Sequence, residues 1–240
     1  TLNNLALVLW GDGDLDQAEE LLVEALGIEE GRAATDPVRA ARFTDSLGLV
    51  LRDQGRLAES EQKLRNALAL KKRGLGSGHA SVAKTLSNLG VVLREQGRVD
   101  EAAACYEEAL EIHRTASGPQ HPSFATALQN LGLTRNATGA FREAEDLLRQ
   151  AVQIRRDVLG EAHYKTGLAQ TYLGASLTGQ GRFQDASAAL EQGLAVLETT
   201  MEPGHGHLLG TFDLMATLYE EWGKPSEAQE WRRRANPDSN

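Results

Sequence analysis

Six glycines recur at a constant spacing of 42 residues along this chain of 240 residues. They are Gly13, Gly55, Gly97, Gly139, Gly181 and Gly223. A fixed period of 20 to 50 residues is typical of repeat arrays, in which one unit buries its apolar face only by stacking on its neighbours. The register predicts five full repeats and a shortened sixth, starting near residues 1, 43, 85, 127, 169 and 211.

Within one repeat, the apolar residues follow helical spacing on both sides of the glycine. Leu86, Leu89 and Leu93 precede Gly97, and a second apolar stripe begins at Val99. A glycine between two helices can adopt the left-handed backbone conformation that ends the first helix. The composition agrees, because 5% aromatic residues and only six prolines favour helices over strands. The sequence therefore predicts an all-α protein of helix–turn–helix repeats.

Small residues also recur in register with the glycines. In the third repeat they include Gly90 after Leu89, Ala102, and Ala109 before a leucine, with Arg98 directly after the glycine of the turn. This pattern resembles the tetratricopeptide repeat (TPR). The 42-residue period and the connection at 121–122, a histidine and a proline, resemble the variety found in kinesin light chains. The resemblance covers residues 1 to about 235 and implies one superhelical domain, a right-handed α-solenoid, followed by a tail at 236–240.

In TPR arrays the first helices line a concave groove, and the resemblance places the fourth residue of each repeat there. An asparagine amide can pair with both backbone groups of an extended peptide, so recurring asparagines predict a ladder that grips a main chain. A solvated polar face is the alternative. Other groove columns carry positive charge or form an apolar floor. The predicted groove residues are Asn4, Asn88, Asn130 and Tyr172, with Ser46 in the same column, the cations Arg42, Arg52, Lys84 and Arg94, and the floor residues Leu49 and Val91.

The chain is acidic, with a formal net charge of -9, which argues against a general binder of nucleic acid or anionic membranes. The cations are predicted near the first three repeats, where they would favour an acidic peptide, although ordinary surface charge explains them equally well. The leading interpretation is a scaffold that binds a protein or peptide. The alternatives are the sensor portion of a larger signalling protein, such as a nucleotide-binding switch ATPase, and an enzyme, for which no acid/base constellation or cofactor motif is found.

The histidines His79, His121, His163 and His205 form another column. We expect them to begin the next helices rather than to bind a metal, with the His205 and His207 pair as a minor metal alternative. Cys105 is predicted to be a small buried apolar residue. One cysteine and no long apolar segment favour a cytoplasmic location. Because the first repeat begins in mid-pattern at Thr1, we expect further repeats or another domain before it, or self-association at this end.

Overall fold

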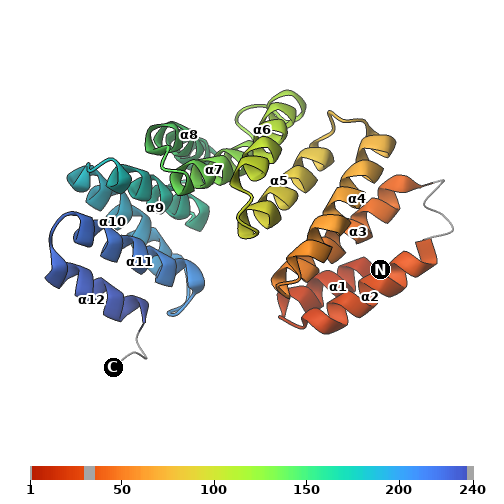
Figure 1. Ribbon diagram of the computed structural model, residues 1–240, viewed down its shortest axis with the longest axis horizontal. Helices are drawn as coiled ribbons and strands as arrows, with labels where there is room; N and C mark the ends of the chain where they lie inside the picture. The colour runs from red at the N-terminus through yellow and green to blue at the C-terminus, as the bar shows by residue number, and fades with distance from the viewer. Residues whose placement is uncertain (1, 30–35, 237–240) are drawn as a thin grey trace. The chain divides into compact units, whose positions relative to one another are not determined.

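The computed structural model describes residues 2–29 and 36–236, and these residues form twelve α-helices and no strand (Figure 1). The helices are α1 (Leu2–Gly11), α2 (Leu15–Glu29), α3 (Pro37–Asp53), α4 (Leu57–Leu75), α5 (Ala80–Glu95), α6 (Val99–Ala116), α7 (Pro122–Ala137), α8 (Phe141–Leu159), α9 (Tyr164–Gly179), α10 (Phe183–Thr200), α11 (Gly206–Glu221) and α12 (Pro225–Ala235). They pair as six hairpins, and the last helix is short. The predicted all-α architecture of helix–turn–helix repeats is confirmed.

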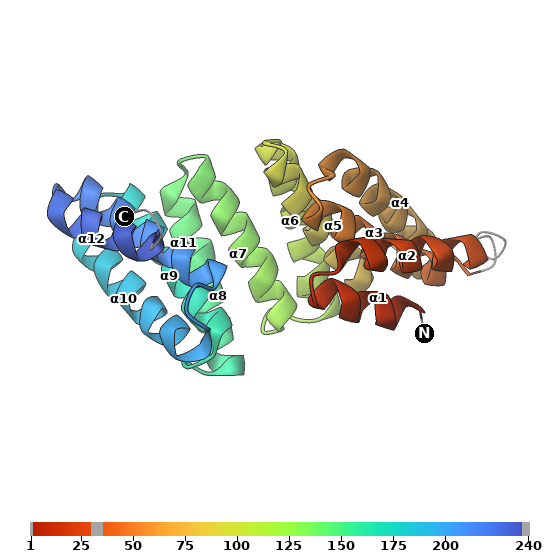
Figure 2. The ribbon, with the colours of Figure 1, turned by 90° about the horizontal axis from the view of Figure 1, so that it is seen from below.

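The hairpins fall into two compact units, residues 1–118 and 119–240. In each unit the second helix of one hairpin packs on the first helix of the next. These contacts join α2 to α3 and α4 to α5 in the first unit, and α8 to α9 and α10 to α11 in the second (Figures 1 and 2). Each unit thus has a continuous core shared between neighbouring hairpins. The single domain over 1–235 stays a prediction.

The glycine of each turn has the predicted left-handed conformation. In the third repeat α5 ends at Glu95, and Gly97 follows with a φ of 79°. The backbone N–H of Gly97 donates to the carbonyl of Arg94 at 2.9 Å, and that of Arg98 donates to the carbonyl of Leu93 at 2.8 Å. A left-handed residue after the helix lets these donors turn back to its last carbonyls, and glycine adopts this φ without steric cost.

The small residues of the first helices allow the two helices of a hairpin to approach closely. A Cβ built on Gly90 would lie 2.6 Å from the Tyr106 ring, and one built on Gly132 would lie 2.7 Å from the Leu148 side chain. Both distances are shorter than Cβ atoms adopt in proteins, so a side chain at either position would displace its neighbour. The close approach that the recurring small residues predicted is therefore confirmed in both units.

The histidine column begins helices, as predicted. In each case the Nδ1 atom accepts a hydrogen bond of 3.1 Å from the backbone N–H two residues later, which satisfies a donor of the first helical turn. These N-caps are His79, His121, His163 and His205. The histidines are therefore explained by helix capping.

The first hairpin differs from the others because part of its apolar face is uncovered. Leu5 and Val8 of α1 are 51% and 58% exposed, whereas their register equivalents Leu47 and Val50 in α3 are 2% and 0% exposed. In α3 this face packs against α2, including Leu22. The leucine column is therefore buried from the second repeat onward, and Leu5 does not share that burial.

Candidate peptide-binding surface

A cavity of about 290 Å³ lies in the first unit, where α1, α3, α4 and α5 meet. Three of its lining residues are cations and one is an acid. The cavity is lined by Asn3, Val38, Arg42, Asp45, Ser46, Lys71, Leu75, Ser81 and Lys84. The structure therefore brings together three residues predicted for the groove, Arg42, Ser46 and Lys84, with others that the sequence analysis did not select.

The buried wall of the cavity contains an ion pair. Lys71 of α4 donates from Nζ to Asp45 Oδ2 at 3.1 Å and to Thr85 Oγ1 at 2.7 Å. The Thr85 hydroxyl in turn donates to Asp45 Oδ1 at 2.9 Å. All three residues are buried. Charge and hydrogen-bonding capacity are thus matched inside the protein, which is the condition under which a buried ion pair is tolerated.

The exposed rim of the cavity carries two cations without acidic partners. Arg42 and Lys84 are exposed, and neither makes an ion pair in the described part of the chain. The other two predicted groove cations differ from them. Arg52 is half-buried and pairs with the adjacent Asp53, and Arg94 is half-buried outside the cavity. Of the four predicted groove cations, Arg42 and Lys84 are therefore the two that are exposed at the cavity, while Arg94, also without an ion pair among the described residues, lies outside it.

The predicted amide column varies along the chain. Asn4 is exposed on α1, whereas Asn88 on α5 is half-buried, with its Nδ2 atom buried and without a hydrogen-bond partner. In the second unit Asn130 and Tyr172 are half-buried on α7 and α9. Ser46, in the same column, donates from Oγ to Asn3 Oδ1 at 3.2 Å. The predicted floor residues Leu49 and Val91 are half-buried too. Whether these side chains grip a main chain stays a prediction.

A column that the sequence analysis missed lies near the end of the second helices. Four of its five members are buried polar or charged residues. The signal was present in the sequence as an ionisable residue repeated in one register. The members are Glu29, Lys71, His113, Arg155 and Leu197.

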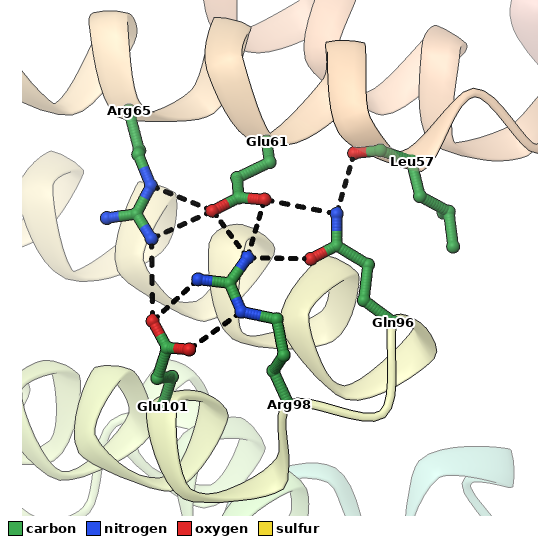
Figure 3. A network of polar contacts seen from close by, with 6 residues as sticks. All are labelled: Leu57, Glu61, Arg65, Gln96, Arg98 and Glu101. Atoms are coloured by element: carbon green, nitrogen blue, oxygen red, sulfur yellow. Dashed lines mark hydrogen bonds and ion pairs between the residues drawn. The ribbon is translucent and has the colours of Figure 1, made fainter.

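Exposed ionic clusters also join neighbouring hairpins (Figure 3). Arg98, just after the turn glycine, donates to both oxygens of Glu61 in the preceding hairpin at 2.8 and 2.7 Å, and to Glu101 in its own hairpin. Gln96 adds a bond to Glu61 at 3.1 Å. Burial opposes ionisation of Glu61, but bonds from Arg98, Arg65 and Gln96 outweigh it and lower the pKa of Glu61. The same arrangement recurs at Glu19 with Arg56 and at Glu145 with Arg182. These clusters order the stack, and their cations are already paired.

Other candidate sites of the sequence analysis carry little chemistry. His205 and His207 have ring centroids 5.1 Å apart, and the described residues hold no group of three or more His, Cys, Asp or Glu side chains placed to bind a metal. Cys105 is half-buried beside an apolar cluster, and burial raises the pKa of its thiol. Within residues 2–29 and 36–236, no helix has both the length and the hydropathy needed to cross a membrane.

Comparison with family models agrees with the repeat register. A model described as Tetratricopeptide repeat matches residues 39–114, 81–157 and 124–199, and a second model of the same description matches residues 1–28. No curated protein matches the chain.

Several solved structures resemble the chain. BtubC (BKLC) from P. vanneervenii has a TM-score of 0.74 and 21% identity, with 93% of this chain and 90% of that chain covered. A Podosopora anserina protein of nearly identical TPR-like repeats, of the kinesin light chain kind, has a TM-score of 0.69 and 24% identity, with 84% and 95% covered. PilW, a type IV pilus biogenesis factor, has a TM-score of 0.71 and 17% identity, with 100% and 93% covered. These likenesses establish the fold, an α-solenoid of repeats, and no catalytic family is among the matched models.

Proposed function

This chain belongs to the tetratricopeptide repeat family, whose arrays are scaffolds for protein–protein interaction, and from that premise we propose that its first unit binds an acidic peptide segment. The observation that carries the proposal is the rim of the 290 Å³ cavity, where Arg42 and Lys84 stand exposed without acidic partners. Elsewhere on this unit, arginines such as Arg56 and Arg98 are held in ionic clusters. A peptide carboxylate can therefore pair with the rim cations without breaking an existing ion pair.

The cavity also offers groups for the peptide main chain. Ser46 and Asn3 line it beside the cations. Asn88 on α5 lies outside the lining, and its buried Nδ2 has no hydrogen-bond partner among the described residues. Polar side chains that pair with backbone groups add affinity without reading sequence. In this proposal the amides hold the extended chain, and Arg42 and Lys84 select acidic side chains.

The test reverses the rim charges and follows the binding of an acidic peptide. The double substitution Arg42→Glu and Lys84→Glu is expected to weaken binding of a hexaglutamate peptide about tenfold or more, which corresponds to about 1.4 kcal/mol. Isothermal titration or fluorescence anisotropy over a salt series measures the loss and the expected flattening of the salt dependence. Fold stability should change by less than about 1 kcal/mol, since exposed charges contribute little to it.

A matched control uses a cation of the same exposure at another place. Arg142 on α8 is exposed and makes no ion pair in the described part of the chain, so Arg142→Glu makes the same change of charge as Arg42→Glu alone without touching the cavity. If this control lowers the affinity as much as Arg42→Glu alone does, binding follows net charge and the proposed surface is wrong.

We also propose that the uncovered face of α1 pairs with the same face of a second copy. Leu5 and Val8 occupy positions that the stack buries in α3, and two such faces could cover each other. Sedimentation at increasing concentration should show a dimer that Leu5→Glu with Val8→Glu abolishes. A native chain that stays monomeric throughout would contradict this.

A further inference from the structure

Arg155 of α8 is a buried cation without a carboxylate partner. It is 4% exposed, and its bonds reach only neutral groups of the second unit. Nη1 donates to the side-chain oxygen of Gln129 on α7 and to the carbonyl of Lys165 at 2.8 Å, and Nη2 lies 3.5 Å from Thr126 Oγ1. Burial lowers the pKa of Arg155 to about 10, an effect that Tyr172 and Tyr164 oppose. Within the described residues, this guanidinium therefore has hydrogen-bond acceptors but no negatively charged partner.

The equivalent site in the first unit shows which group Arg155 lacks, namely a carboxylate. Lys71 occupies the same register position as Arg155, and Asp45 occupies the same position as Gln129. Lys71 and Asp45 form a buried ion pair at 3.1 Å, whereas the bond between Arg155 and Gln129 joins a cation to an amide. A buried charge without a counterion is costly, by several kcal/mol in folded proteins. The two units thus present the same site with and without its carboxylate.

We propose that Arg155 binds the carboxylate of a partner peptide, which supplies, beside Gln129, the negative charge that Asp45 supplies in the first unit. The carboxylate is favoured over a phosphate because the equivalent site accommodates a carboxylate side chain between three helices. The approach is over Thr126, an exposed residue whose Oγ1 is the only hydrogen-bond partner of Nη2 among the described residues. Nε makes no hydrogen bond within these residues either, so the guanidinium has spare donors for a carboxylate.

This site is independent of the rim cations proposed above, because its residues all belong to α7, α8 and α9. Its cation comes from a second helix, α8, whereas the amide column lies on first helices. The decisive substitution is Gln129→Glu, which nearly preserves the shape of the side chain and gives Arg155 an internal carboxylate, as Asp45 does for Lys71. This variant should be more stable than the native chain, and its Arg155 should no longer bind the carboxylate of a partner peptide.

The experiment records the Nε–Hε cross-peak of Arg155 in the ¹⁵N-labelled chain, identified by its loss in Arg155→Lys. Hexaglutamate, hexaglutamine and inorganic phosphate are titrated separately at constant ionic strength. The Arg155 signal should shift and saturate with hexaglutamate and stay unchanged with hexaglutamine. In Gln129→Glu the affinity for hexaglutamate, read from the Arg155 signal, should fall at least tenfold. The melting temperature should rise, by about 2 to 4 °C for each kcal/mol added to the free energy of unfolding. A second variant, Thr126→Glu, places a carboxylate beside Nη2 of Arg155 and should weaken the response of the Arg155 signal to hexaglutamate similarly.

Arg42→Glu with Lys84→Glu separates this proposal from the previous one, because it should leave the Arg155 response intact even where it abolishes binding at the first unit. A native Arg155 signal that ignores hexaglutamate would overturn the inference. So would equal responses in the native chain and in both carboxylate variants, or a response to phosphate alone.

Discussion

Lys71 and Arg155 occupy one position of the repeat, two repeats apart, and both are buried near the end of a second helix. Their surroundings differ at both positions that hydrogen-bond to Lys71. Lys71 faces Asp45 and Thr85, whereas Arg155 faces Gln129, and the equivalent of Thr85 is Ala169. At this position the first unit therefore neutralises its buried cation with its own carboxylate, and the second unit does not.

This difference shows that the repeats share a backbone pattern but differ in their buried polar residues. The turn glycine and the capping histidine recur because each satisfies a local backbone requirement that every hairpin has. The buried column has no such requirement, since Leu197 occupies it in the fifth repeat without any charge. A cation at this position is therefore not needed for the hairpin to form, and its retention in α8 without a counterion is what points to a ligand.

The largest effect is expected from making one substitution at both places. Lys71→Met leaves the Asp45 carboxylate buried without its counterion, and breaking a buried pair in this way costs about 3 to 5 kcal/mol. Arg155→Met removes a charge that has no counterion, so the relief from desolvation offsets the lost bonds to Gln129 and Lys165. That variant should lie within about 1 kcal/mol of the native chain. Urea denaturation followed by circular dichroism at 222 nm measures both.

Lys72→Met provides the control for loss of a lysine from the same helix. Lys72 is half-buried and pairs with Glu108 at 2.8 Å near the surface, where ion pairs contribute about 0 to 1 kcal/mol. Equal losses of stability for Lys71→Met and Arg155→Met would contradict the comparison, because they would mean that Asp45 makes no difference.

The sequence was sufficient to predict the hairpins, their turns and the histidine caps. Each depends on a few residues close together in the chain, such as Gly97 with the preceding helix or His79 with the backbone two residues on. The close packing of paired helices was also predictable. A residue as small as Gly90 is required only where a large side chain of the partner helix approaches it closely.

The buried column was not predicted, for a physical reason. Lys71 stands in a run with Lys72 and Arg73, a pattern typical of a solvated helix end, and only the meeting of α3, α4 and α5 buries the first of the three. The groove charges were predicted in part. Arg42 and Lys84 line one cavity, but the pairing of Arg52 with the adjacent Asp53 depends on side-chain rotamers, which the repeat register does not determine.

A smaller effect is expected from Thr85, the residue that completes the buried pair in the first unit. Thr85→Val preserves the shape of the side chain and removes a hydroxyl that accepts from Lys71 and donates to Asp45. Hydrogen bonds to charged groups contribute about 1.5 to 3 kcal/mol, so the loss should approach that range and stay below that of Lys71→Met. The substitution brings the first unit closer to the second, where Ala169 supplies no hydroxyl.

Thr44→Val separates this network effect from the loss of any buried hydroxyl. Thr44 is equally buried on α3, but its hydroxyl donates only to the carbonyl of Ala40 within its own helix, at 2.9 Å. That carbonyl keeps its helical partner when the hydroxyl is removed, so the variant should lose less than about 1 kcal/mol. If Thr44→Val and Thr85→Val unfold at the same urea concentration, Thr85 acts only by filling space. Lys71 and Asp45 then satisfy each other without it, and the missing carboxylate alone distinguishes Arg155 from Lys71.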